Sequence, residues 1–188
     1  IWRLLGFVVY PDGSGVATTA GGLRALILPA GYLGAALFGA LLFFAANRFP
    51  YSRYLSGGLG VLLIVFTVLF GMGSITAILV GILFGAALLA LAKFANHTVN
   101  LIVLDVLAIL TGLNAVLDLW YLTQYSDARL GDLHNDAAAF AREIVPLTPG
   151  WLWAGLWALL AVAMLAAAVW FSVVHPLMGR MKDEAPRR

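Results

Sequence analysis

The 188-residue chain contains no cysteine and very little charge, and each absence excludes a class of protein. Without cysteine there is no disulfide framework, no thiolate nucleophile and no thiolate metal site. Asp, Glu, Lys and Arg make up 11% of the residues, against about 25% in a typical soluble domain. The net charge of +2 is too small and too scattered for nucleic-acid binding, so we expect no nucleic-acid partner.

Apolar residues dominate instead, at 63% of the chain with a mean hydropathy of +0.98. A chain of this composition cannot cover its apolar residues with a polar surface, so an integral protein of the lipid bilayer is expected. A helix needs roughly 20 apolar residues to cross the hydrocarbon. Five stretches qualify, and the predicted fold class is an all-α polytopic membrane protein with about five transmembrane helices. The stretches are residues 25–46, 54–70, 74–92, 99–123 and 151–174.

A short β-hairpin is predicted before the first span, in the segment "VVYPDGSGVATTAGG". Residues 7–10 and 16–19 are rich in β-branched and aromatic side chains, and Pro11, Asp12 and Gly13 between them are typical of a turn. The segment is either a plain connection or an exposed edge that accepts an extended peptide by strand addition. The candidate edge residues are Val16, Ala17, Thr18 and Thr19.

Three segments follow from these patterns: a hairpin over 1–22, a transmembrane bundle over 23–175 with a polar loop at 124–150, and a polar tail over 176–188. Seven basic residues fall on the side of the tail and four on the other side. This difference predicts a cytoplasmic C-terminus. Close helix packing is expected at Gly81 and Gly85 and at Ala30 and Gly34, and "NDAAAFAREI" in the polar loop predicts a short amphipathic helix.

The fourth span is the only one with several polar side chains. At about 100° per residue, Thr111, Asn114 and Asp118 share one stripe, while Asp105 lies on another face. Asp118 is a zinc ligand, a protonated residue bonded to a neighbouring helix, or a hydrated residue near the interface. Asp105 bonds a packing partner or shuttles a proton. No two histidines are four residues apart, and the sequence contains no HExxH.

Several segments resemble one known family. "VVYPDGSGVATTAGG" followed by "PAGYLGAALFGALL", together with "LNAVLDLWYL" and "NDAAAFAREIVPLTPGWLWAGLW", is similar to the bacterial B-like branch of the M-fifty peptidases, which are site-2-protease-like intramembrane zinc metallopeptidases. The resemblance covers about the whole chain. It implies one zinc ion, held by two histidines of an HExxH helix and by an aspartate of a later helix, with an asparagine nearby. The matching positions are Asp118 and Asn114, with Thr111 supporting them.

In that family the HExxH helix, which also supplies the general-base glutamate, lies just before the hairpin. This chain begins at Ile1 rather than at a methionine. We therefore expect the two histidines and the glutamate upstream, and expect the chain alone to be inactive. The resemblance implies attack of a zinc-bound hydroxide on a peptide carbonyl of a membrane-embedded protein substrate.

The substrate helix must unwind before cleavage, because its carbonyls are otherwise hydrogen-bonded. The hairpin edge is expected to hold the unwound segment as an added strand. Proline at Val16 and Thr18 is then expected to slow cleavage.

Two alternatives stay open. One is an inactive protease relative that acts as a membrane adaptor or chaperone. The other is a small proton-coupled transporter that uses Asp105 and Asp118. The predicted location is the bacterial inner membrane.

Overall fold

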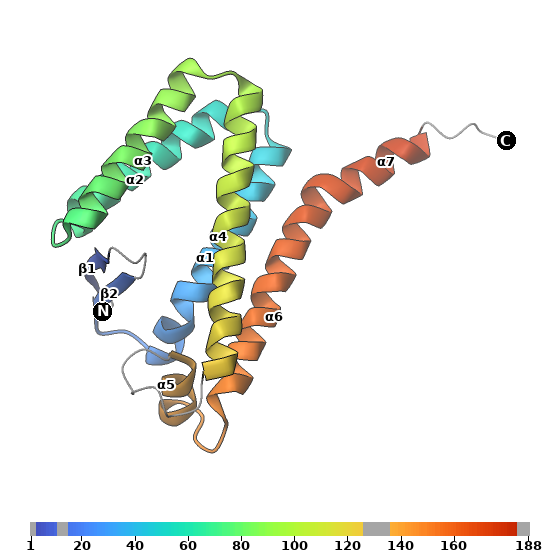
Figure 1. The fold of residues 1–188 in the computed structure, drawn as a ribbon. Coiled ribbons are helices and arrows are strands. Elements are labelled where there is room, and N and C mark those ends of the chain that lie inside the picture. The colour runs from blue at the N-terminus through green and yellow to red at the C-terminus, as the bar shows by residue number, and fades with distance from the viewer. Residues whose placement is uncertain (1–2, 11–14, 126–135, 184–188) are drawn as a thin grey trace. The chain divides into compact units, whose positions relative to one another are not determined.

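The computed structural model describes residues 3–10, 15–125 and 136–183. It is mostly helical, with a two-stranded hairpin at its start and five helices long and apolar enough to cross a membrane. The predicted fold class is confirmed, and the chain is an integral membrane protein by this criterion. The elements, shown in Figure 1, are β1 Arg3–Val9, β2 Gly15–Ala20, α1 Arg24–Arg48, α2 Ser52–Phe70, α3 Ile75–Phe94, α4 His97–Tyr125, α5 Asp136–Glu143, α6 Gly150–Val169, the π-helical turn η1 Trp170–Val174 and α7 His175–Asp183.

The chain stays helical beyond α6, through residues that the sequence analysis assigned to a polar tail. The polar end of the chain predicts an irregular tail, but η1 leads directly into α7, which ends at Asp183. Pro176 has no N–H and cannot close an α-helical bond to the carbonyl of Ser172. The wider η1 turn lies immediately before it, and Pro176 then occupies the first turn of α7, where proline is tolerated.

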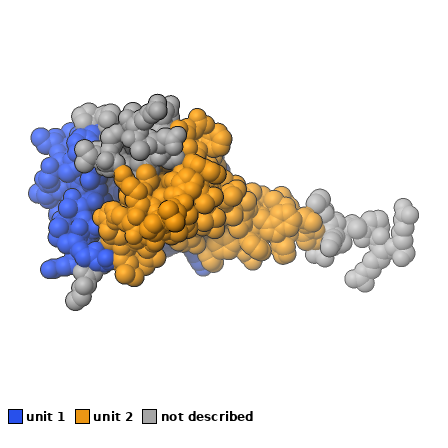
Figure 2. All heavy atoms as spheres, turned by 90° about the horizontal axis from the view of Figure 1, so that it is seen from below, with its two compact units in different colours: residues 1–22, 50–103 blue, residues 23–49, 104–188 orange. Residues whose placement is uncertain are grey.

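The chain forms two compact units (Figure 2). Unit 1 comprises residues 1–22 and 50–103, and unit 2 comprises residues 23–49 and 104–188. Helix α4 contributes its first seven residues to unit 1 and the remainder to unit 2. Each unit is described separately below.

In unit 1, α2 and α3 approach closely where both carry glycine. A methyl group at Gly60 would lie 2.7 Å from the carbonyl oxygen of Gly85, and one at Gly85 would lie 2.6 Å from Cγ1 of Ile64. Gly81 faces the side chain of Thr67 in the same way. The predicted packing role of Gly81 and Gly85 is confirmed.

The second small-residue pair meets no other helix in the described part of the chain. A methyl group at Gly34 would meet no described atom within 4 Å, and Ala30 is exposed. The expectation for Ala30 and Gly34 was therefore wrong, because small residues four apart mark a helix contact only where a second helix faces them. In unit 2 the close approach lies at Gly39, whose added methyl would come within 2.7 Å of the Ala108 carbonyl oxygen.

Gly85→Ala and Gly34→Ala are therefore expected to have opposite effects on stability. At Gly85 the added methyl overlaps Ile64 and should cost about 1–3 kcal/mol. At Gly34 it meets open space, so alanine's better helix propensity should leave stability unchanged or raise it by up to about 1 kcal/mol. Unfolding in mixed micelles measures both, and equal losses would contradict the close approach at Gly85.

The core of unit 2 brings α5 against α1, α4 and α6. Phe140 of α5 packs against two rings of α6, with centroids 4.7 Å from Trp153 and 5.4 Å from Trp157. Arg24 at the start of α1 forms a two-pronged ion pair with Glu143 at the end of α5. The predicted amphipathic helix is thereby confirmed as α5. The core residues are Leu28, Ala36, Ala115, Leu119, Leu122, Ala137, Phe140, Ala154, Trp157 and Ala161.

The predicted hairpin is also confirmed. Strands β1 and β2 are antiparallel, with Phe7 opposite Ala17 and Val8 opposite Val16, and the register shifts around Leu5. Strand β1 begins at Arg3, four residues before the predicted start at Phe7. The predicted turn at Pro11, Asp12 and Gly13 lies outside the described residues.

Candidate functional site

The polar stripe of α4 lies in unit 2. Asn114 and Asp118 are both exposed, one helical turn apart on the same face. Neither makes a hydrogen bond to a described residue. Thr111 is half-buried, and its hydroxyl donates to the Leu107 carbonyl at 2.7 Å. The Thr111 hydroxyl is thus hydrogen-bonded within its own helix. Asn114 and Asp118 are the residues of the stripe whose side chains make no hydrogen bond to a described residue.

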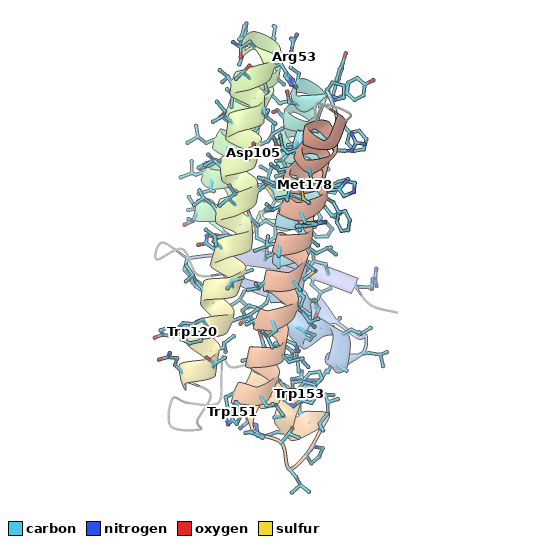
Figure 3. The ribbon with its side chains drawn as sticks, turned by 90° about the vertical axis from the view of Figure 1, so that its right-hand side faces the viewer. Arg53, Asp105, Trp120, Trp151, Trp153 and Met178 are labelled. Atoms are coloured by element: carbon cyan, nitrogen blue, oxygen red, sulfur yellow. The ribbon has the colours of Figure 1, made fainter. Side chains whose placement is uncertain are left out.

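Two exposed tryptophans lie at this end of unit 2. Trp120 and Trp151 are exposed and lie at the same end of unit 2 in Figure 3. Tryptophan is enriched where hydrocarbon meets the headgroups. Asp118 is two residues from Trp120 on the same helix.

Two other polar groups accompany Asp118. The half-buried phenol of Tyr32 on α1 donates a hydrogen bond to Asp136 at the start of α5. Helices α1, α4 and α5 therefore each contribute one polar side chain to this end of unit 2. The sequence analysis missed Tyr32 and Asp136, because only folding brings them near Asp118.

Asp105 has a different environment. It is half-buried, and its Oδ1 accepts a hydrogen bond of 2.6 Å from Nδ2 of Asn47 on α1 (Figure 3). The same Nδ2 donates to the Phe43 carbonyl at 3.0 Å. Of the two roles expected for Asp105, the structure thus shows a packing partner.

The described residues do not by themselves form a zinc site. Zinc in a peptidase needs three protein ligands and a water molecule. No three His, Asp or Glu side chains come together in the described part of the chain. In unit 1, Nδ1 of His97 lies 2.6 Å from Oγ of the buried Ser52. His175 is exposed at the start of α7, and His134 lies outside the described ranges. Asp118 can provide one ligand, and the remaining ligands are not found here.

Within unit 1, strand β1 of the hairpin contacts α2 and α3. The Ser74 hydroxyl donates to the Val9 carbonyl at 2.9 Å and accepts from the Val9 N–H at 3.3 Å. The same oxygen caps α3 by accepting from the N–H of Ala77. Phe7 packs on Phe66 with ring centroids 6.4 Å apart. These contacts hold β1 against the turn between α2 and α3. The role of Ser74 was not predicted, since only its position as a helix cap is visible in the sequence.

The other strand, β2, has an open edge. Val16, Ala17 and Thr18 are exposed and Thr19 is half-buried, and no described strand pairs with β2 apart from β1. Backbone groups in an antiparallel pair point alternately toward and away from the partner strand. Since both groups of Val9 point to Ser74, those of Val8 point to Val16. The backbone N–H and C=O groups of Val16 and Thr18 therefore point toward β1, whereas those of Ala17 point outward at the open edge.

This alternation of backbone groups changes which proline substitution tests the open edge. Proline at Val16 or Thr18 would remove a bond of the hairpin itself rather than a group at the open edge. The residue to change is Ala17.

Comparison with known proteins adds the family. The Peptidase M50B-like family matches residues 2–168, which include the hairpin, all of α1 to α5 and most of α6. No curated protein and no solved structure matches the chain. The match covers well over half of the sequence, so the chain belongs to the Peptidase M50B-like family.

Proposed function

We propose that this chain is part of an intramembrane zinc metallopeptidase that hydrolyses peptide bonds within or next to the membrane. The family match over residues 2–168 carries the proposal. The exposed carboxylate of Asp118, on a membrane-spanning helix, supports it as the place of a third zinc ligand. The described residues do not complete a zinc site, so the proposal requires two further ligands and a general base in addition to Asp118.

The proposed substrate is a membrane-embedded protein, held by the open edge of β2. An unwound substrate segment has free N–H and C=O groups that need partners in or near the membrane. The outward N–H and C=O of Ala17 offer such partners, and β1 is held in place by Ser74. Recognition through the backbone suits a peptidase that must bind segments of differing sequence.

The proposed location is the bacterial inner membrane with a cytoplasmic C-terminus. The excess of basic residues around Arg48, Arg53, Lys93 and the tail supports this orientation. The hairpin would then face away from the cytoplasm.

The experiment uses the full-length protein encoded by its gene, reconstituted in liposomes with single-span membrane proteins of its own host. Cleavage that a chelator abolishes and zinc restores is the expected result. Retention of a single-span protein without cleavage would replace the peptidase with a membrane adaptor. Proton-coupled solute flux without zinc would indicate a transporter and would equally overturn the proposal.

A further inference from the structure

Unit 1 contains a groove between α2 and α3, on the side away from the hairpin. Its volume is about 490 Å³. Gly57, Gly58 and Val61 of α2 line one wall and Leu89 of α3 lines the other, with Arg53 and Lys93 also among the lining residues. Nothing in the proposed peptidase function uses this groove.

Missing side chains keep the groove open. A methyl group at Gly58 would meet no atom within 4 Å, and one at Gly57 would meet only Cβ of Ala92 at 3.5 Å. One turn further on, Gly60 lies against the backbone of Gly85 and the two helices close together. The groove is therefore lined mainly by apolar residues and carries two cations near the ends of α2 and α3.

Both cations have donors to spare. Arg53 uses Nε for the Ala92 carbonyl at 2.9 Å and Nη2 for the Lys93 carbonyl at 3.2 Å, which fixes the guanidinium over the end of α3. A guanidinium has five N–H donors, so three remain. The ammonium of Lys93 lies 5.1 Å from the ring centroid of Phe94.

Neither cation has a carboxylate partner among the described residues of unit 1. Residues 3–10, 15–22 and 50–103, which make up the described part of unit 1, contain no Asp or Glu. Two cations held near each other at a membrane surface repel unless an anion lies between them. The exposed ring of Tyr54 beside them is typical of the headgroup level.

We propose that this groove binds one anionic phospholipid. Its phosphate lies between Arg53 and Lys93, and one acyl chain follows Gly57, Gly58 and Val61 into the membrane. Arg53 and Val61 are eight residues apart, so the groove is about 12 Å long, enough for the upper part of an acyl chain. Basic pockets between transmembrane helices are suited to acidic headgroups. The proposal does not depend on peptidase activity.

The test is native mass spectrometry of the full chain released from detergent, with phosphatidylglycerol and phosphatidylcholine carrying the same acyl chains. One phosphatidylglycerol should remain bound, with an affinity about 25-fold above that of phosphatidylcholine if each cation contributes about fivefold. Arg53→Gln with Lys93→Gln should remove this preference. Arg48→Gln, an exposed arginine at the end of α1 outside the groove, is the matched control and should keep it.

A second variant separates the groove from the charges. Gly58→Leu fills open space and keeps both cations, so it should reduce lipid retention while the unfolding temperature in neutral detergent stays unchanged. Equal retention of the two lipids by the wild-type chain would overturn the proposal. So would an equal effect of Arg48→Gln, full retention by Gly58→Leu, or displacement of the lipid by inorganic phosphate, which would indicate an anion site without an acyl groove. If Arg53→Gln fails to fold, Lys93→Gln alone and Gly58→Leu decide the question.

Discussion

Replacing Asp118 by asparagine in the full-length protein is expected to lower its zinc affinity and its rate of hydrolysis by at least about 100-fold, the upper end of the loss seen when a group that merely supports a metal ligand is removed. A carboxylate oxygen is a zinc donor, whereas an amide is neutral and a poor one. Asp118 is exposed and makes no hydrogen bond to a described residue, so the stability should change by no more than about 0.5 kcal/mol. Zinc is measured by atomic absorption, and hydrolysis is measured in proteoliposomes.

Asp105→Asn is the matched control, because it makes the same chemical change on the same helix. Asp105 accepts a hydrogen bond from Asn47, and the amide oxygen of asparagine can accept the same bond, so the replacement should change stability by no more than about 1 kcal/mol and leave zinc bound. The two variants thus separate a ligand from a structural carboxylate. Normal zinc affinity in Asp118→Asn would remove Asp118 from the ligand set, and an equal loss in Asp105→Asn would mean that the loss reports unfolding.

The sequence predicts well those features that are determined by residues close together in the chain. Five spans follow from the length of apolar segments, and the hairpin follows from two β-branched runs around Pro11, Asp12 and Gly13. The stripe of Asn114 and Asp118 follows from helical periodicity and is present in α4. Each of these patterns is complete within one element.

Contacts between distant residues were not predictable from one sequence. Ser74 and Val9 are 65 residues apart, Asn47 and Asp105 are 58 apart, and Tyr32 and Asp136 are 104 apart. Gly34 illustrates the same limit. Its spacing from Ala30 matches a packing motif, but no described helix faces it. A single sequence shows which residues are small or polar, but it does not show what lies opposite them.

The outward N–H of Ala17 allows the second large effect to be tested with one substitution. Ala17→Pro removes the N–H at the open edge of β2 and leaves the bonds between Val8 and Val16 in place. If a substrate strand pairs with this edge, kcat/KM should fall roughly 10- to 100-fold, because a buried substrate carbonyl loses its donor at a cost of about 1–3 kcal/mol. Cleavage of a single-span substrate measures the effect, and hydrogen exchange of the Val16 amide reports whether the hairpin is intact.

Two neighbouring substitutions make this result specific. Ala17→Val keeps the N–H and favours a strand, so this variant should cleave substrate at the normal rate. Thr18→Pro removes a hydrogen bond to Gly6, so in this variant cleavage should slow and the hairpin amides should also lose their protection against hydrogen exchange. If Ala17→Pro cleaves at the normal rate with a protected Val16 amide, the edge does not hold substrate. If Ala17→Val is as slow as Ala17→Pro, the substrate contacts the side chain at this position rather than the backbone. Loss of activity in Ala17→Pro alone, with the hairpin intact, requires a partner that hydrogen-bonds along the outer edge of β2.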